Sequence, residues 1–147
     1  MGSRRDVLKL LSKILASFAF MFSVPLHSKN QSSIADNTEK LIKRIKGRVF
    51  TRADKEYESR RRGMSWQFRK TSRKPDILVQ AKNSDDLLTA VKFAKENKLK
   101  VGIRTGGHSW VHSAIREGGM LLDLGEFKSL EIDEENTTAI AGPALTA

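Results

Sequence analysis

The stretch KVGIRTGGHSW, residues 100–110, decides how the chain is expected to fold. The segment from Leu99 to Ile103 is mostly apolar and bounded by polar residues, which is typical of a buried strand. Two adjacent glycines, Gly106 and Gly107, follow closely, and glycine adopts the positive φ angles that a tight loop needs. The pattern predicts a strand that ends in a loop whose backbone can pass close to a ligand.

The residue types in this loop favour binding of a phosphate or pyrophosphate group. Successive N–H groups exposed in such a turn form a nest for an anion. Thr105 and Ser109 add hydroxyl donors, and Arg104 adds a charge suited to phosphate. The loop also follows the carboxyl end of a strand, where open parallel sheets bind their ligands. A purely structural loop, in which His108 bonds to a backbone carbonyl, is the alternative that the residues leave open.

The residues before the loop predict a strand–helix–strand unit. Ile77 to Val79 form a short run of branched apolar side chains, which indicates a buried strand. Asn83 and Ser84 predict a turn and a helix cap, and apolar residues then recur at near-helical spacing through residues 84–97. With the strand at 99–103, this makes a βαβ unit whose two strands are expected to be parallel.

Several short strands are predicted after the loop. Residues 120–124 form a mostly apolar run, and residues 130–133 alternate between apolar and acidic side chains. A turn at 134–136 and a further strand at 137–141 complete the pattern of an antiparallel hairpin. The predicted fold class is α+β, with a small βαβ-containing subdomain followed by short antiparallel strands.

Residues 1–35 resemble a bacterial export signal. Residues 3–9 read SRRDVLK, which matches the twin-arginine pattern S-R-R-x-F-L-K except that Val7 replaces Phe. An apolar run at 10–26 follows, but Lys13 interrupts it, and a membrane span needs about 20 apolar residues. We expect export by a twin-arginine translocase, to the periplasm or the outside of a bacterial cell. A basic amphipathic helix lying on a membrane surface is the alternative.

The chain divides into three predicted regions. Ser33-Ile34-Ala35 is a small-x-small motif after which a signal could be cleaved, so residues 1–35 are the predicted signal, with an uncleaved anchor as the alternative. Residues 36–74 are predicted to be a basic linker with a helical lead-in, in which Thr38 caps a short helix that ends by Gly47. Residues 75–147 carry the folded part. A total of 147 residues corresponds to at most one domain of ordinary size.

Composition excludes several kinds of site. The chain has no cysteine, which excludes disulfides, cysteine-based zinc sites, iron–sulfur clusters and thiol catalysis. Its three scattered histidines have no metal-ligand spacing, so no metal site is predicted. The 27 Lys and Arg residues exceed the 17 Asp and Glu residues, giving a net charge of +10. Such a charge attracts phosphate polymers and anionic membranes.

A basic segment at 43–74 holds thirteen of these cations and only three acids. Tyr57, Trp66 and Phe68 are interleaved with them, as in a nucleic-acid-binding patch. An alternative function is therefore a non-catalytic basic protein that binds nucleic acid or an anionic membrane through this segment. Charge runs more often form a solvated surface, and export argues against nucleic acid as a partner.

The stretch from Trp66 to Ala141 resembles the start of the FAD-binding domain of FAD-linked oxidoreductases. The domain is of the vanillyl-alcohol oxidase/p-cresol methylhydroxylase (PCMH) type, and the nearest resemblance is to berberine-bridge-enzyme-like oxidases. The matching features, in chain order, are Arg73-Lys74-Pro75, the helix at 84–97, KVGIRTGGHSW at 100–110, GGMLLDLGEFKSLEID at 118–133 and TTAIAGPA at 137–144.

The resemblance implies FAD as the cofactor and a PCMH-type FAD-binding domain as the fold. In that family the loop wraps the pyrophosphate with backbone amides, and the histidine matching His108 is often bonded covalently to the flavin ring. Full-length members oxidise small alcohol- or sugar-type substrates by hydride transfer to FAD. The residues assigned to the cofactor by this match are Arg104, Thr105, Gly106, Gly107, His108, Ser109 and Gly142.

Three departures from the family pattern affect what is expected. The family usually has glycine where His112 stands, and a small residue where Pro143 follows Gly142. Family members also continue well beyond residue 147, with the rest of the FAD domain and a substrate domain. No catalytic residue is therefore assigned, and we expect this chain alone to be incomplete and inactive as an enzyme.

Overall fold

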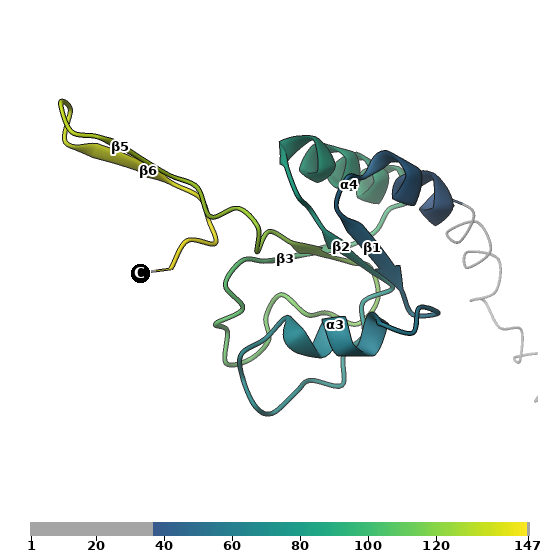
Figure 1. The fold of residues 1–147 in the computed structure, drawn as a ribbon. Helices are drawn as coiled ribbons and strands as arrows, with labels where there is room; N and C mark the ends of the chain where they lie inside the picture. The colour runs from purple at the N-terminus through teal and green to yellow at the C-terminus, as the bar shows by residue number, and fades with distance from the viewer. Residues whose placement is uncertain (1–36, 147) are drawn as a thin grey trace, which may run out of the picture. The chain divides into compact units, whose positions relative to one another are not determined.

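The structure is a computed structural model that describes residues 37–146. The predicted export signal at 1–35 lies outside the described residues. Within the described part, no helix is long and apolar enough to cross a membrane. The described elements are a helix at 37–44, β1 (Arg48–Thr51), α3 (Tyr57–Gly63), β2 (Ile77–Gln80), α4 (Ser84–Glu96), β3 (Val101–Arg104), β4 (Met120–Asp123), β5 (Leu130–Asp133) and β6 (Thr138–Ala141) (Figure 1).

Four short strands form one mixed sheet in the order β1-β2-β4-β3. β2 and β3 each pair in parallel with β4, and β1 pairs antiparallel with β2. The predicted parallel direction of β2 and β3 is confirmed, although β4 lies between them. All four residues of β4 are buried, as expected for a strand in the centre of a sheet covered on both faces.

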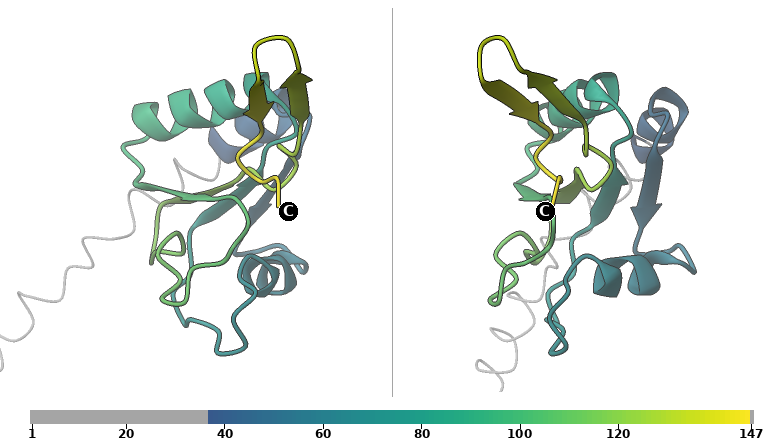
Figure 2. Two further views of the ribbon diagram at one scale, coloured as in Figure 1. Left: turned by 90° about the vertical axis from the view of Figure 1, so that its left-hand side faces the viewer. Right: turned by 60° about the vertical axis from the view of Figure 1, so that its left-hand side comes forward.

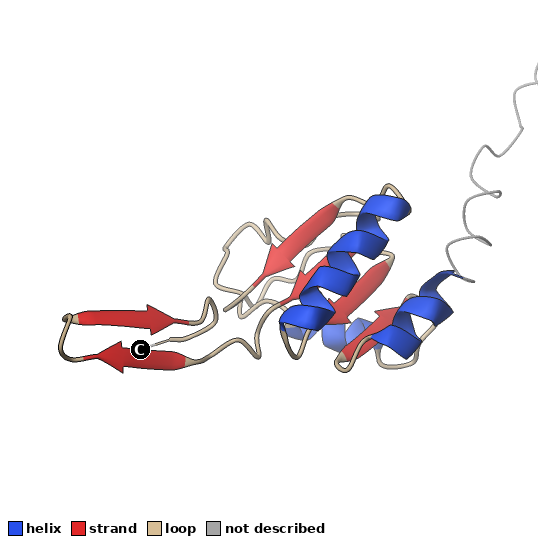
Figure 3. Ribbon diagram, turned by 90° about the horizontal axis from the view of Figure 1, so that it is seen from above, coloured by secondary structure: helices blue, strands red, loops and turns tan. Residues whose placement is uncertain are grey.

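Helices cover both faces of this sheet. The helix at 37–44 and α4 lie side by side over one face, and α3 lies on the other (Figures 2 and 3). On the α3 side, the core cluster includes Phe50 of β1, Leu78 of β2 and Leu121 of β4. Tyr57 of α3 joins this cluster and donates a hydrogen bond to the Pro75 carbonyl at 2.5 Å. Burial raises the pKa of Tyr57 to about 12, so the phenol stays protonated at neutral pH.

Local sequence signals predicted the elements after residue 75 well. The helix predicted at 84–97 is α4, and the Asn83 side chain caps it by accepting the Asp86 N–H at 2.9 Å. The predicted hairpin is also confirmed, because β5 pairs antiparallel with β6. All eight residues of these two strands are exposed, so the hairpin buries little surface of its own within the described part.

The prediction of a linker and helical lead-in at 36–74 missed β1 and α3. The expected short helix is present at 37–44. Residues 48–51, however, form a strand of the sheet and are not part of a linker. β1 has one buried residue, Phe50, and α3 has only Tyr57 and Arg61. These elements are short and have few buried residues, so their sequences show no periodic pattern of apolar side chains. Their stability depends on contacts with residues far along the chain.

Asp86 joins three parts of the fold. It is 1% exposed, and its carboxylate accepts N–H groups from Lys46 and Gly47 before β1 and from Lys82 after β2, at 2.8–2.9 Å. Burial alone would raise the pKa of Asp86, but these three backbone donors outweigh it and lower the pKa below its ordinary value. The charged form is therefore the one that the fold stabilises.

We expect Asp86→Ala to lower the free energy of unfolding by about 3 kcal/mol, because three partly buried N–H groups lose the buried carboxylate that accepts them. Urea denaturation at pH 7 measures this. The matched control is the exposed neighbour Asp85→Ala, which should cost about 0.5 kcal/mol through the helix dipole. Because the folded pKa is lowered, the contribution of Asp86 is present above about pH 4 and lost as pH falls. Equal effects of the two variants would contradict this role.

Candidate functional site

The carboxyl ends of the three parallel strands carry a row of linked polar side chains. Gln80, Asp123 and Arg104 end β2, β4 and β3, and strand register places them beside one another. Arg104 Nη1 donates to Asp123 Oδ1 at 2.8 Å, and Gln80 Nε2 donates to Asp123 Oδ2 at 3.1 Å. The Arg104 and Asp123 side chains are only 19% and 8% exposed, so this ion pair is largely removed from solvent.

Two further N–H groups of Arg104 bond to the protein backbone. Its Nε donates to the Met64 carbonyl at 3.2 Å and its Nη2 donates to the Gly106 carbonyl at 3.4 Å. The sequence predicts Arg104 as a charge for the cofactor phosphate, but this guanidinium holds the loop that follows it. Its part in a binding site is therefore to position the loop.

Three glycines allow the close approaches in this arrangement. Gly107 has φ +76°, and a Cβ there would lie 2.6 Å from the Met64 carbonyl oxygen. A Cβ on Gly106 would collide with the His108 ring, which folds back over it. A Cβ on Gly125 would lie 2.5 Å from Arg104 Nη1. A side chain at Gly107 would therefore collide with backbone, whereas one at Gly106 or Gly125 would require His108 or Arg104 to move.

The loop presents a run of open hydrogen-bond donors. No described residue accepts a hydrogen bond from the backbone N–H groups of residues 105–110 or from the Thr105 hydroxyl. The Ser109 hydroxyl is engaged locally, since its oxygen accepts the Ser113 N–H at 3.1 Å. Consecutive unpaired N–H groups next to a left-handed glycine form an anion-binding nest. The residues present therefore fit a pyrophosphate.

The remaining predicted site residues are His108 and Gly142. His108 is exposed, and neither of its ring nitrogens bonds to a described residue, so the imidazole is accessible. Gly142 lies after β6, where its N–H donates to the Ser129 carbonyl at 2.8 Å and a Cβ would collide with the Phe127 carbonyl. Within residues 37–146, no hydrogen bond joins Gly142 to the loop.

His112 stands in a left-handed conformation, with φ +53°. That conformation accounts for the glycine that the family usually has here, because glycine adopts it without strain. The His112 side chain is 9% exposed, and its Nε2 has no hydrogen-bond partner. The backbone instead stabilises the turn, since the His112 carbonyl accepts the Ile115 N–H at 3.0 Å and Arg73 Nη2 at 3.2 Å.

Sequence reasoning missed the segment that supports the loop from the other side. The Trp66 N–H donates to the Gly107 carbonyl at 3.3 Å. The Trp66 and Trp110 rings meet edge to face, with centroids 4.9 Å apart. Both rings are more than half exposed, at 51% and 69%. The Asp123 partner of Arg104 was missed as well, and its one sequence signal is a charged residue at the end of an otherwise apolar strand.

Two cavities lie along this edge of the sheet. One, of about 280 Å³, is lined by Gln80, Asp123 and Arg104 together with residues of α3. The other, of about 450 Å³, shares Gln80 and Arg60 with the first and is more basic. Its cationic lining residues are Lys46, Arg48, Arg60 and Lys82, against a single acid, Glu126. This excess of positive charge favours the approach of an anionic ligand.

Much of the basic segment at 43–74 is bonded within the molecule. Arg52 pairs with Asp76 and Glu117, and Arg60 pairs with Glu56. Further internal bonds come from Arg61, Lys70 and Arg73. The hydrogen bond from Arg61 lowers the pKa of Glu58, which keeps that pair charged. Five of the thirteen cations therefore serve the fold rather than an open basic surface.

Comparison with known proteins finds a family match in the same part of the chain. Residues 75–147 match the model of an FAD-binding domain. The FAD-linked oxidoreductase YgaK of Bacillus subtilis is 32% identical over 96 residues, which cover 65% of this chain and 21% of YgaK. The chain thus spans about a fifth of the length of this relative.

Solved structures share the fold. The crystal structure of 6-hydroxy-D-nicotine oxidase from Arthrobacter nicotinovorans matches with a TM-score of 0.59 and 28% identity, over 69% of this chain and 22% of that one. The berberine-bridge-enzyme-like protein 1 of Physcomitrella patens matches with a TM-score of 0.64 and 24% identity, over 74% and 23% of the two chains. The predicted PCMH-type fold is confirmed by these neighbours.

We expect Gly107→Ala to lower the free energy of unfolding by about 2 kcal/mol, because alanine resists a positive φ and its Cβ would press on the Met64 carbonyl. Chemical denaturation measures the change. Gly63→Ala is the matched control, since a Cβ there meets nothing within 4 Å. Alanine favours a helix by about 1 kcal/mol, so the control should not destabilise. A Gly107→Ala variant as stable as the wild type would contradict the packing of this loop.

Proposed function

The chain belongs to the family of FAD-linked oxidoreductases, because its residues 75–147 match an FAD-binding domain, and from this match we propose a function. The chain is the FAD-binding portion of a flavin-dependent enzyme that oxidises a small alcohol- or sugar-type substrate. When bound, FAD supplies the two-electron redox chemistry, and the protein supplies binding and orientation.

The observation that carries this proposal is the run of open N–H donors at residues 105–110. These amides would bind the pyrophosphate oxygens, with the Thr105 hydroxyl as a further donor. Arg104 would contribute by holding the loop through Asp123 and the Gly106 carbonyl. The basic cavity beside the loop would supply the longer-range attraction for the anionic cofactor.

His108 is the residue we propose to hold the flavin covalently. Its imidazole is exposed at the loop and has no partner within the described residues. Neutral imidazole is a good nucleophile near pH 7. The ring lies directly over Gly106, so the same loop would hold the pyrophosphate through its amides and the flavin through its side chain.

We expect the purified chain to carry flavin absorbance that stays with the protein after acid precipitation. We expect His108→Ala to release that flavin into the supernatant. The His108 side chain is exposed, so its loss should leave the fold intact, and a thermal melt of the variant checks this. His27→Ala is the matched control, because it removes a histidine outside the FAD-binding match and should retain the flavin.

Two results would contradict parts of the proposal. Flavin that leaves the wild-type protein on precipitation would support FAD binding but contradict the covalent bond to His108. A colourless chain that takes up no added FAD would contradict FAD binding by residues 75–147.

We propose further that residues 1–35 direct export through a twin-arginine translocase. The sequence SRRDVLK at 3–9 and the weakly apolar run after it support this proposal. Such a route carries proteins that have already folded, which suits a protein that must bind a cofactor before it leaves the cell. The destination would be the periplasm or the exterior of a bacterial cell.

In a bacterial host with this translocase, we expect the double variant Arg4→Lys, Arg5→Lys to remain in the cytoplasm, because the pathway recognises the arginine pair rather than its charge. Cell fractionation and immunoblotting measure the distribution. The control makes the opposite exchange outside the motif, Lys13→Arg with Lys29→Arg, and should leave export unchanged. Equal export of wild type and the Arg4, Arg5 variant would rule out this route.

A further inference from the structure

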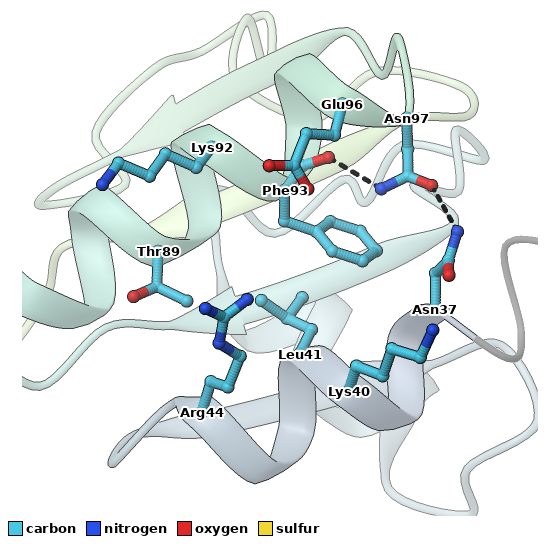
Figure 4. A pocket seen from close by; sticks show the side chains of 9 residues that line it. All are labelled: Asn37, Lys40, Leu41, Arg44, Thr89, Lys92, Phe93, Glu96 and Asn97. Carbon is cyan, nitrogen blue, oxygen red and sulfur yellow. Dashed lines mark hydrogen bonds between the residues drawn. The ribbon is translucent and has the colours of Figure 1, made fainter.

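A second cavity lies away from the loop, between the helix at 37–44 and α4. Its volume is about 350 Å³, within the range of small-molecule sites. Figure 4 shows the side chains that line it, which come from the two helices, with Leu41, Arg44 and Phe93 lying between them. The lining residues are Asn37, Lys40, Leu41, Arg44, Thr89, Lys92, Phe93, Glu96 and Asn97.

Hydrogen bonds and packing fix the shape of this cavity. Asn37 Nδ2 donates to Asn97 Oδ1 at 3.0 Å, and Asn97 Nδ2 donates to the Phe93 carbonyl at 2.8 Å (Figure 4). Leu41 and Phe93 are 2% and 8% exposed, so they form a packed apolar floor between the helices. The base of the cavity is therefore packed, and the charged side chains of its lining are exposed above it.

The charges around the cavity are unbalanced. Lys40, Arg44 and Lys92 carry three positive charges, and Glu96 carries the only negative charge of the lining. Within residues 37–146, none of these four side chains has a hydrogen-bond or ion-pair partner. Lys40 and Arg44 are also four residues apart on one helix, where like charges repel each other. A bound anion would relieve this repulsion.

We propose that this cavity binds a small organic phosphate. Arg44 lies beside the Thr89 methyl group in Figure 4, and rotation of the Thr89 side chain would bring its hydroxyl next to the planar guanidinium, so that both could donate to phosphate oxygens. Lys40 and Lys92 add charge, and the floor of Leu41 and Phe93 suits the carbon part of the ligand. The lining residues include none from the loop at 104–109, so this site is separate from the proposed FAD site.

The test is an NMR titration of the 147-residue chain with phenyl phosphate, and separately with inorganic phosphate. We expect amide shift changes centred on residues 40–44 and 89–93, and several-fold tighter binding of phenyl phosphate. Arg44→Gln should weaken binding about tenfold, since it removes a charged donor. Thr89→Val, which keeps the side-chain shape, should weaken it several-fold and serves if Arg44→Gln folds poorly.

Lys43→Gln is the matched control, because it removes one positive charge from the same helix turn outside the cavity lining. It should leave the affinity within twofold of the wild type. Equal losses in Lys43→Gln and Arg44→Gln would overturn the proposal, since they indicate attraction to net charge alone. Shift changes confined to residues 104–110 would also overturn it, and equal affinities for the two probes would overturn the assignment to an organic phosphate.

Discussion

The candidate site depends on the ion pair between Arg104 and Asp123. A largely buried pair is stable only when further hydrogen bonds satisfy both groups. Asp123 also accepts bonds from Gln80 and from the Gly125 N–H, at 3.1 and 3.0 Å. Arg104 also donates to the carbonyls of Met64 and Gly106. The pair therefore joins the ends of three strands and fixes the direction in which the loop leaves the sheet.

Because Arg104 holds the loop, two contributions to the proposed anion binding come from different parts of the site. Because three of its five N–H groups are directed at protein acceptors, the proposed anion site relies on the backbone N–H groups of the loop. Main-chain donors in a constrained loop are already in position, so little entropy is lost when a ligand binds. The excess positive charge of the neighbouring cavity acts over longer distances, and its attraction for an anion weakens with salt. In the proposed site, the loop would orient the bound anion, and the positive charge of the cavity would attract it from a distance.

The sequence was informative where the structure is local. The cap at Asn83, the helix at 84–96, the glycine loop and the β5–β6 hairpin each depend on residues close together in the chain, so their patterns predicted them. The place of β4 between β2 and β3 depends on pairing across some forty residues. The same applies to the bond between Gln80 and Asp123, and to Phe50, whose burial depends on distant strands. No local pattern encodes such contacts.

The high arginine content has a structural explanation that composition alone concealed. Four arginines each donate to two backbone carbonyls, namely Arg52, Arg61, Arg73 and Arg104. These carbonyls lie outside the helices and outside the strand ladders. Carbonyls in such segments lack regular partners, and leaving them unpaired would be costly where they are buried. A guanidinium offers five donors in a fixed plane, so one side chain can satisfy two carbonyls at once. Part of the positive charge thus stabilises the irregular segments around the loop, and composition overstates the charge that is free to bind a partner.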